Sequence, residues 1–269
     1  MDILSDKIKK EIQKDVVDPI LKKNYDAALD NIPGVIKKLY ASIPENKRIS
    51  YGVVYAIKVF SEYLHNALIN LNLPVYRVGL DFFNKSSDFR GVGVALWILS
   101  FYGLDNLKKV LPCFESAAAY DDWIVREITQ MFFRKLIKKH PDETQRYLLK
   151  LVKSKDKNIR RFVGETLRPV QENKWFYKNP EYSLCVLRKM FKESSAYPRT
   201  SVGNNLSDLA KRLPEYVYGL IGELVDSGNK NSYWIAYRAC RNLVKKEPEK
   251  VMSLLKIKEY KYKDKVYRI

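Results

Sequence analysis

The sequence holds few of the residues that metal sites, nucleophilic catalysis and disulfides need. Only two histidines, His65 and His140, and three cysteines are present among 269 residues. Cys113, Cys185 and Cys240 lie far apart and show neither a paired framework nor a ligand spacing. We therefore expect small core cysteines in a reducing compartment, no metal or other cofactor, and neither a Ser-His-Asp nor a Cys-His centre.

Glycine and proline are also scarce, with eleven residues of each. Leu, Ile, Val, Lys and Tyr dominate instead, and this composition favours long helices over short strands joined by tight turns. At 46% hydrophobic residues the chain can bury a large core. The sequence predicts a folded, all-α protein.

No hydrophobic run is long enough to cross a bilayer. The most apolar stretch, residues 91–104, is too short, and the N-terminus begins with charged residues rather than a signal peptide. We expect a cytoplasmic, nucleoid-associated protein with no membrane partner.

Positive charge is abundant and unevenly distributed. The net charge is +18, of which residues 1–120 contribute +3 and residues 121–269 contribute +15. A polyanion is the partner that this asymmetry favours, because each neutralised phosphate releases counterions. A basic surface kept for solubility is the alternative.

A repeat of 34 to 39 residues runs through the second half of the chain. Four segments share a hydrophobic and basic helix start, at residues 123–127, 158–162, 198–202 and 234–238. Pro141, Pro214 and Pro248 each follow a basic stretch and precede an acidic residue, which is a helix-start signal. The pattern predicts an α-solenoid of HEAT-like helix pairs, about six or seven in all. An irregular helical bundle with chance periodicity is the alternative.

We expect one HEAT-like domain over residues 1–269. Residues 1–120 form its less regular half, with helices over 21–40, 51–71 and 92–101 and with connections at Pro74, Gly79 and Ser86-Ser87. Residues 121–255 form the basic repeats that carry the site. Residues 256–269 form a basic tail, expected to be frayed and to pack only through its aromatic side chains.

Two segments carry polar residues that a repeat scaffold does not require. In one, Glu165 stands among Arg160, Arg161 and Arg168 near a helix end, and Trp175 follows in a polar connection. In the other, the spacing of Asn204 and Asp208 places them on one helix face.

Three ordered blocks in this region resemble the DNA alkylation repair glycosylases of the AlkC and AlkD type, and AlkC more closely. They read IRRFVGETLRP over 159–169, RTSVGNNLSDLAK over 199–211 and WIAYRACRNLVK over 234–245, and the resemblance covers about residues 120–255. It implies a HEAT-like solenoid that excises cationic alkylated bases of the 3-methyladenine type from duplex DNA. The chain departs from the AlkC pattern where Gln130 replaces a Glu and where Gly203 and Ser207 replace Ala and Asn.

The resemblance also implies roles for individual residues. Asp208 and Glu165 would be the catalytic carboxylates, and Trp175, Trp123 and Gln130 would contact the lesion. The residues that would hold DNA are Arg160, Arg161, Arg168, Arg199, Arg238, Arg241 and Lys211. A carboxylate suits the reaction because cleavage of an N-glycosidic bond develops positive charge on the sugar.

Each of these residues also has a plain structural interpretation. Asp208 could be a solvated helix carboxylate, and Glu165 could pair with Arg161 or Arg168 along one helix. Trp175 and Trp234 could be core anchors, and Trp123, preceded by Asp121 and Asp122, could mark a helix cap.

The sequence therefore favours a monomeric DNA glycosylase that uses water as the nucleophile. A non-catalytic HEAT-repeat protein that binds distorted or branched DNA is the first alternative. A protein-binding scaffold is the second, and the charge asymmetry argues against it.

Overall fold

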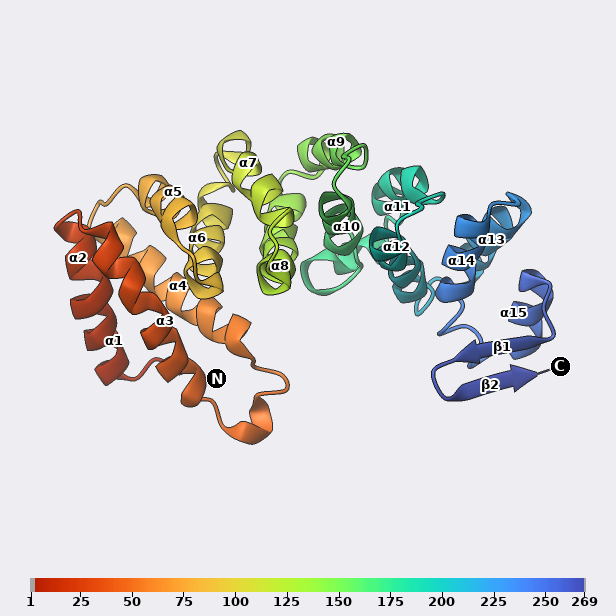
Figure 1. The fold of residues 1–269 in the computed structure, drawn as a ribbon, viewed down its shortest axis with the longest axis horizontal. Coiled ribbons are helices and arrows are strands. Elements are labelled where there is room, and N and C mark those ends of the chain that lie inside the picture. Colours follow the sequence, from red (N-terminus) through yellow and green to blue (C-terminus); the bar gives the residue numbers. More distant parts are fainter. Residues whose placement is uncertain (1–2, 269) are drawn as a thin grey trace. The chain divides into compact units, whose positions relative to one another are not determined.

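The computed structural model describes residues 3–268 and contains fifteen α-helices there (Figure 1). The chain divides into two compact units, residues 1–136 and 137–269, and the boundary falls within one helix, α8. Sheet is confined, in the described part, to a single two-stranded hairpin. These features confirm the predicted all-α class of HEAT-like helical repeats.

The helices of the first unit follow one another with short connections. They are α1 (Asp6–Ile12), the π-helix η1 (Gln13–Val17), α2 (Asp18–Leu21), α3 (Tyr25–Ala41), the 3-10 helix η2 (Glu45–Lys47), α4 (Val53–Asn70), α5 (Val75–Lys85), α6 (Phe89–Tyr102), α7 (Leu107–Ala118) and α8 (Trp123–Lys139).

The second unit continues with helix pairs and ends in the hairpin. Its elements are α9 (Pro141–Leu151), α10 (Lys157–Thr166), η3 (Gln171–Tyr177), α11 (Glu181–Leu187), η4 (Arg188–Met190), α12 (Ala196–Leu209), α13 (Pro214–Asp226), α14 (Lys230–Ala239), α15 (Pro248–Leu255), β1 (Glu259–Tyr262) and β2 (Lys265–Arg268).

Helix α6 is the centre of the first unit's core. Every residue from Gly91 to Ser100 is buried, which explains why this stretch is apolar on all sides rather than along one face. None of the described helices has the length and apolar character needed to cross a membrane.

Two details of the first unit differ from the sequence prediction. The helix expected to begin at Leu21 begins at Tyr25, because Lys23 takes a left-handed φ of 58° and Asn24 then caps the new helix through Ala27 N at 3.2 Å. Gly79 does not mark a connection, and that prediction was wrong. It lies inside α5, where a Cβ would stand 3.1 Å from the Leu99 side chain of α6, so the glycine serves close helix packing.

The predicted repeat is confirmed. The leading helices α8, α10, α12 and α14 begin at residues 123, 157, 196 and 230, which are 34, 39 and 34 residues apart. Pro141, Pro214 and Pro248 are the first residues of α9, α13 and α15, where a missing backbone N–H has no cost.

Glycines set how closely the leading helices of the second unit approach one another. A Cβ on Gly164 of α10 would stand 2.8 Å from Ser201 Cβ of α12, and a Cβ on Gly203 of α12 would stand 2.9 Å from Arg238 Cβ of α14. Gly203, which stands where the AlkC pattern has Ala, thus has a packing reason. Both contacts involve atoms bonded to the backbone, so added volume must displace a helix.

We expect Gly164→Ala to lower the free energy of unfolding by about 1–3 kcal/mol through overpacking, although alanine is the better helix former. Gly219→Ala is the matched control, because Gly219 lies in α13 with open space where its Cβ would be. That change should raise stability by about 0.5–1 kcal/mol. Urea denaturation measures both, and equal effects of the two substitutions would contradict close α10–α12 packing.

The C-terminal segment is not a frayed tail, and that expectation was wrong. Residues 259–268 form an antiparallel hairpin in which Tyr260 pairs with Tyr267 and Tyr262 with Lys265. Tyr260 is fully buried, so the alternation of Lys with Tyr reflects a strand with one face against the protein.

The cysteines are free thiols. Cys113 and Cys240 are buried in the core as expected, and burial raises the pKa of Cys240 to about 12. Cys185 differs from the expectation, because it is exposed on α11.

Candidate functional site

Two buried carboxylates, Glu165 and Asp208, lie close to one guanidinium in the second unit. Glu165 is near the end of α10 and Asp208 near the end of α12, and their side chains are only 7% and 2% exposed. Arg168 bridges them: its Nη1 donates to Glu165 Oε2 at 3.3 Å and its Nη2 to Asp208 Oδ2 at 2.6 Å. The geometry unites two carboxylates that lie 43 positions apart along the chain.

Asp208 is held by two cations at once. Arg168 also donates through Nε to Oδ2 at 2.9 Å, and Lys211 Nζ donates to Oδ1 at 2.7 Å. Arg241 Nη2 stands 4.0 Å from Oδ1. Asp208 is therefore no solvated helix carboxylate, and that alternative interpretation was wrong.

The charges at this centre determine its ionisation. Burial by itself would raise the pKa of Asp208, but the hydrogen bond from Lys211 and the charge of Arg168 outweigh burial and leave that pKa below its ordinary value. Burial would likewise lower the pKa of Arg168, yet Glu165 and Asp208 raise it. The carboxylate and the guanidinium are thus both charged at neutral pH.

Polar side chains of α12 tie this centre to α10. Ser201 Oγ donates to Glu165 Oε1 at 2.8 Å, and Asn205 Nδ2 donates to the carbonyl of Gly164 at 2.7 Å. Sequence reasoning noted Asn205 as a polar residue of this segment but gave neither residue a role. The feature that could have identified them is a Ser and an Asn at buried positions of a helix, where a polar group must find a partner.

A second group of polar contacts joins α12 to α14 and the residues after it. Asn204 Oδ1 accepts from Arg238 Nε at 2.8 Å and from Arg241 Nη1 at 2.7 Å. Arg241 Nε also donates to Ser207 Oγ at 2.9 Å. Arg241 therefore contacts Asn204 and approaches Asp208, which confirms that these two residues share a face of α12.

Two arginines of the predicted DNA-binding set, Arg160 and Arg199, turn back onto the protein. Arg160 forms a two-pronged ion pair with Glu193, with distances of 2.7 and 3.0 Å, and its Nη1 donates to the carbonyls of Ser154 and Lys155. Arg126, which lies outside the predicted set, contacts the carbonyls of Tyr120 and Asp121 in the same way. These side chains brace the loop before their own helix.

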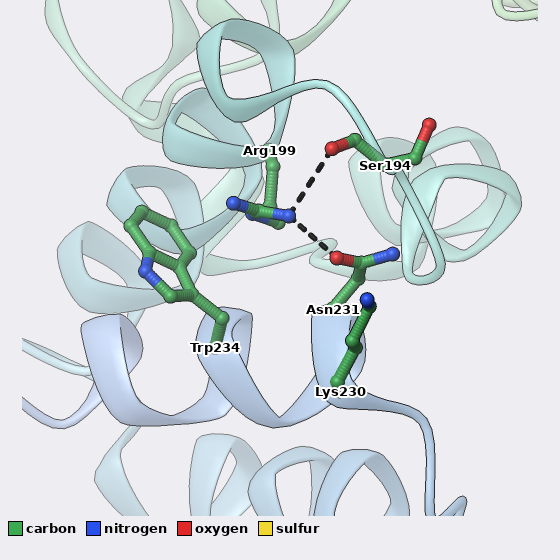
Figure 2. A pocket seen from close by; sticks show the side chains of 5 residues that line it. All are labelled: Ser194, Arg199, Lys230, Asn231 and Trp234. Carbon is green, nitrogen blue, oxygen red and sulfur yellow. Dashed lines mark hydrogen bonds between the residues drawn. The ribbon is translucent and has the colours of Figure 1, made fainter.

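Arg199, like Arg160, braces the loop before its own helix, and it lines an open hollow of about 440 Å³ (Figure 2). Its Nη1 donates to the Ser194 carbonyl at 3.2 Å and to Asn231 Oδ1 at 2.5 Å. The guanidinium lies over the Trp234 ring, 4.9 Å from its centroid, and Arg238 approaches the same ring at 5.6 Å. Trp234 is thus half-buried between two cations rather than a core anchor. Lys230 completes the lining.

Two further predicted cations, Lys211 and Arg161, have different surroundings. Lys211 is 54% exposed although it contacts Asp208. Arg161 lies over the Tyr197 ring at 4.6 Å from the centroid.

The three residues predicted to contact a lesion lie in different surroundings. Trp175 lies in η3 and packs against Phe176 and Tyr182, with ring centroids 4.5 and 4.8 Å away. Trp123 is the first residue of α8 and is 63% exposed; Asp122 Oδ1 caps that helix by accepting from Ile124 N at 2.8 Å. Gln130 is buried in α8 and donates to Glu127. Trp123 and Gln130 belong to the first unit, whereas the carboxylate centre belongs to the second.

The arrangement suits a negatively charged polymer that contains one positively charged group. A buried, ionised carboxylate can stabilise developing positive charge, because it is desolvated and held in place. The half-exposed Lys211 next to it can bind a phosphate.

The sequence similarity to a known protein covers part of the chain. No family model matches the chain. The uncharacterised protein YhaZ of Bacillus subtilis is 26% identical over 161 residues, which cover 57% of this chain and 42% of that protein, so the chain spans less than half of its relative's length.

Solved structures extend the comparison. The alkylpurine DNA glycosylase AlkC of Pseudomonas fluorescens, bound to DNA containing an abasic site analogue, superposes with a TM-score of 0.60 at 19% identity, covering 94% of this chain and 66% of that one. AlkD2 of Streptococcus mutans gives 0.51 at 21% identity, with 62% and 80% covered. The protein smu.31 of Streptococcus mutans UA159 gives 0.53 at 19%, with 69% and 98% covered. The resemblance read from the sequence is therefore confirmed at the level of fold: this chain has the HEAT-like helical-repeat fold of AlkC and AlkD2.

Proposed function

We propose that the chain is a DNA glycosylase that excises cationic N-alkylated purines of the 3-methyladenine type from duplex DNA. The observation that carries this proposal is the Asp208 carboxylate, which is buried, ionised and held between Arg168 and Lys211 beside Glu165. The fold shared with AlkC supports it, since AlkC is an alkylpurine DNA glycosylase.

The reaction is a hydrolysis with water as the nucleophile. The C1′–N bond breaks with its electron pair leaving on the purine, which neutralises the cationic ring. Water adds its oxygen to C1′ and loses a proton to Asp208 or to solvent. Asp208 stabilises the positive charge that the sugar develops, and Glu165 adds negative potential next to it. A neutral base is a poorer leaving group, so the lesion's charge provides selectivity.

Lys211 regulates access to the carboxylate in this scheme. Its ammonium is half exposed and reaches Asp208 through a flexible side chain. A DNA phosphate competes for that ammonium, and its transfer to the phosphate frees Asp208 Oδ1 for the reacting sugar or water. Arg168 keeps the other oxygen in place, so Arg168 acts as a positioning residue.

The proposed DNA contacts come from the remaining cations. Arg161, Arg238, Arg241 and Lys211 are the members of the predicted set that we place on phosphates first, whereas Arg160 and Arg199 hold loops. Trp175, Trp123 and Gln130 stay predictions as lesion-contacting residues. The proposed protein acts as a monomer and without a cofactor.

A non-catalytic DNA-binding protein for distorted or branched duplexes is the second candidate. The interaction of both Asp208 oxygens with cations favours it, because a fully paired carboxylate also suits a purely structural ion-pair network.

Base release from N-methylated duplex DNA distinguishes the two candidates. We expect the wild type to release 3-methyladenine at a rate well above spontaneous loss, and to leave unmethylated duplex intact. Binding to the same duplex is measured in parallel at two salt concentrations. Salt-sensitive binding without any release would contradict the glycosylase and support the second candidate.

A further inference from the structure

The C-terminal hairpin is attached firmly to the second unit. The Tyr260 ring stacks on Tyr237 of α14, with centroids 4.3 Å apart and planes at 18°, and its hydroxyl donates to the Tyr237 carbonyl at 2.8 Å. In return, Tyr237 Oη accepts from Lys261 N at 2.7 Å and donates to the Lys261 carbonyl at 2.9 Å. Such reciprocal bonds hold β1 against α14.

This attachment places the hairpin beside two cations of the candidate site. Arg238 follows Tyr237, the stacking partner of Tyr260, directly in α14, and its Nε donates to Asn204 of α12. Arg241 lies two residues beyond the end of α14 and approaches Asp208. The hairpin is therefore anchored next to Arg238, which shares the Asn204 acceptor with Arg241.

The strand register gives the hairpin two different faces. Tyr260, Tyr262, Tyr267 and Lys265 share one face, and the residues opposite one another on the second face are Glu259 with Arg268 and Lys261 with Val266. The first face carries the buried anchor Tyr260. Edges of both strands are free of further strands in the described part of the chain.

Cationic charge concentrates on this small element. Residues 256–268 hold six basic and two acidic residues, a net charge of +4. Glu259 is neutralised by Arg268 and Lys261. By contrast, Lys258, Lys263 and Lys265 are exposed, and no carboxylate of residues 3–268 forms an ion pair with them.

Lys263 occupies a position of the hairpin turn whose backbone conformation is unfavourable for lysine. Lys263 has a φ of 53° in the two-residue turn, a conformation that glycine or asparagine adopts more easily. The Lys263 ammonium lies 6.0 Å from the centroid of the Tyr262 ring, and the left-handed backbone costs the turn about 1 kcal/mol.

We propose that residues 258–268 form a DNA-binding wing, in which Lys258, Lys263 and Lys265 bind backbone phosphates of duplex DNA next to the carboxylate centre. The inference rests on the duplex partner of the proposed function and adds an element outside the helical repeats. Charge complementarity and the fixed position beside Arg238 carry it. The wing extends the phosphate-binding surface along the duplex without reading its sequence.

A triple substitution, Lys258→Gln, Lys263→Gln and Lys265→Gln, tests the wing. Its matched control replaces three exposed lysines on or next to the trailing helices of the same unit, Lys150→Gln, Lys153→Gln and Lys189→Gln, with the same loss of charge. Binding of a labelled unmodified duplex is followed by fluorescence anisotropy over a range of salt concentrations. Circular dichroism melting shows whether both proteins keep the wild-type fold.

We expect the hairpin variant to bind at least about tenfold more weakly, with a slope of log K against log salt that is smaller by about 2–3, because each lost phosphate contact removes about 0.9. The control should resemble the wild type. Equal binding by the hairpin variant and the control would overturn the wing and leave the proposed function intact. Absence of salt-dependent duplex binding by the wild type would overturn the proposed DNA partner, and the wing with it.

Discussion

Replacing Asp208 with Asn is expected to reduce base release from methylated duplex by at least about 100-fold while duplex binding persists. The substitution keeps the shape of the side chain and removes its negative charge, so the developing cation at the sugar loses its main electrostatic stabilisation. Binding should become as tight as in the wild type or tighter, because Arg168 and Lys211 lose an anionic partner and gain free charge for phosphates.

Asp226→Asn is the matched control for that experiment. Asp226 is an exposed carboxylate of the same unit, paired only with Lys256 on the surface, and its replacement should leave base release unchanged. Retention of release by Asp208→Asn would assign the carboxylate a structural role. Loss of release in both variants would point to a general effect of charge on the complex.

Replacing Arg168 with Met is expected to lower the free energy of unfolding by about 3 kcal/mol, with a fall in Tm of about 10 °C. Met fills the volume of the aliphatic side chain but leaves Glu165 and Asp208 buried without their shared guanidinium. Desolvated carboxylates are costly when unpaired, and Lys211 reaches only Asp208.

Arg188→Met provides the control for this prediction. Arg188 pairs with Glu223 at the surface, and removal of such an exposed pair should change the stability by less than about 1 kcal/mol. Combining Arg168→Met with Asp208→Asn should recover part of the loss, because a neutral amide no longer needs the cation. A single Arg168→Met variant as stable as the wild type would contradict the buried ion-pair network.

These two substitutions separate the roles of the carboxylate centre. A network that only stabilises the fold would respond to Arg168→Met and leave base release unaffected by Asp208→Asn. A catalytic centre responds to Asp208→Asn through the reaction rate. The shared fold with AlkC does not decide between them, since related scaffolds can carry different functions.

Sequence patterns predicted the repeats because the repeats follow from local rules. Apolar periodicity specifies which helix face is buried, and Pro141, Pro214 and Pro248 specify where trailing helices begin. The same reasoning failed at Gly79, since a glycine needed for close packing against Leu99 and a glycine in a turn look alike in a sequence.

Functional roles of the arginines could not be assigned in this way. Arg160 and Arg168 stand eight residues apart in one block, yet Arg160 braces a loop and Arg168 joins two buried carboxylates. Their partners, Glu193 and Asp208, lie 33 and 40 residues away along the chain. Only the stacking of α10 on its neighbours decides which acid each guanidinium meets.

The sequence by itself determined the helical class, the spacing of the repeats and the cationic second half, because composition and periodicity act over short stretches of chain. The tertiary structure alone decided that Glu165 and Asp208 share Arg168 and that the C-terminal segment is an anchored hairpin. Both depend on contacts between distant residues, where burial removes water and makes the choice of partner energetically decisive.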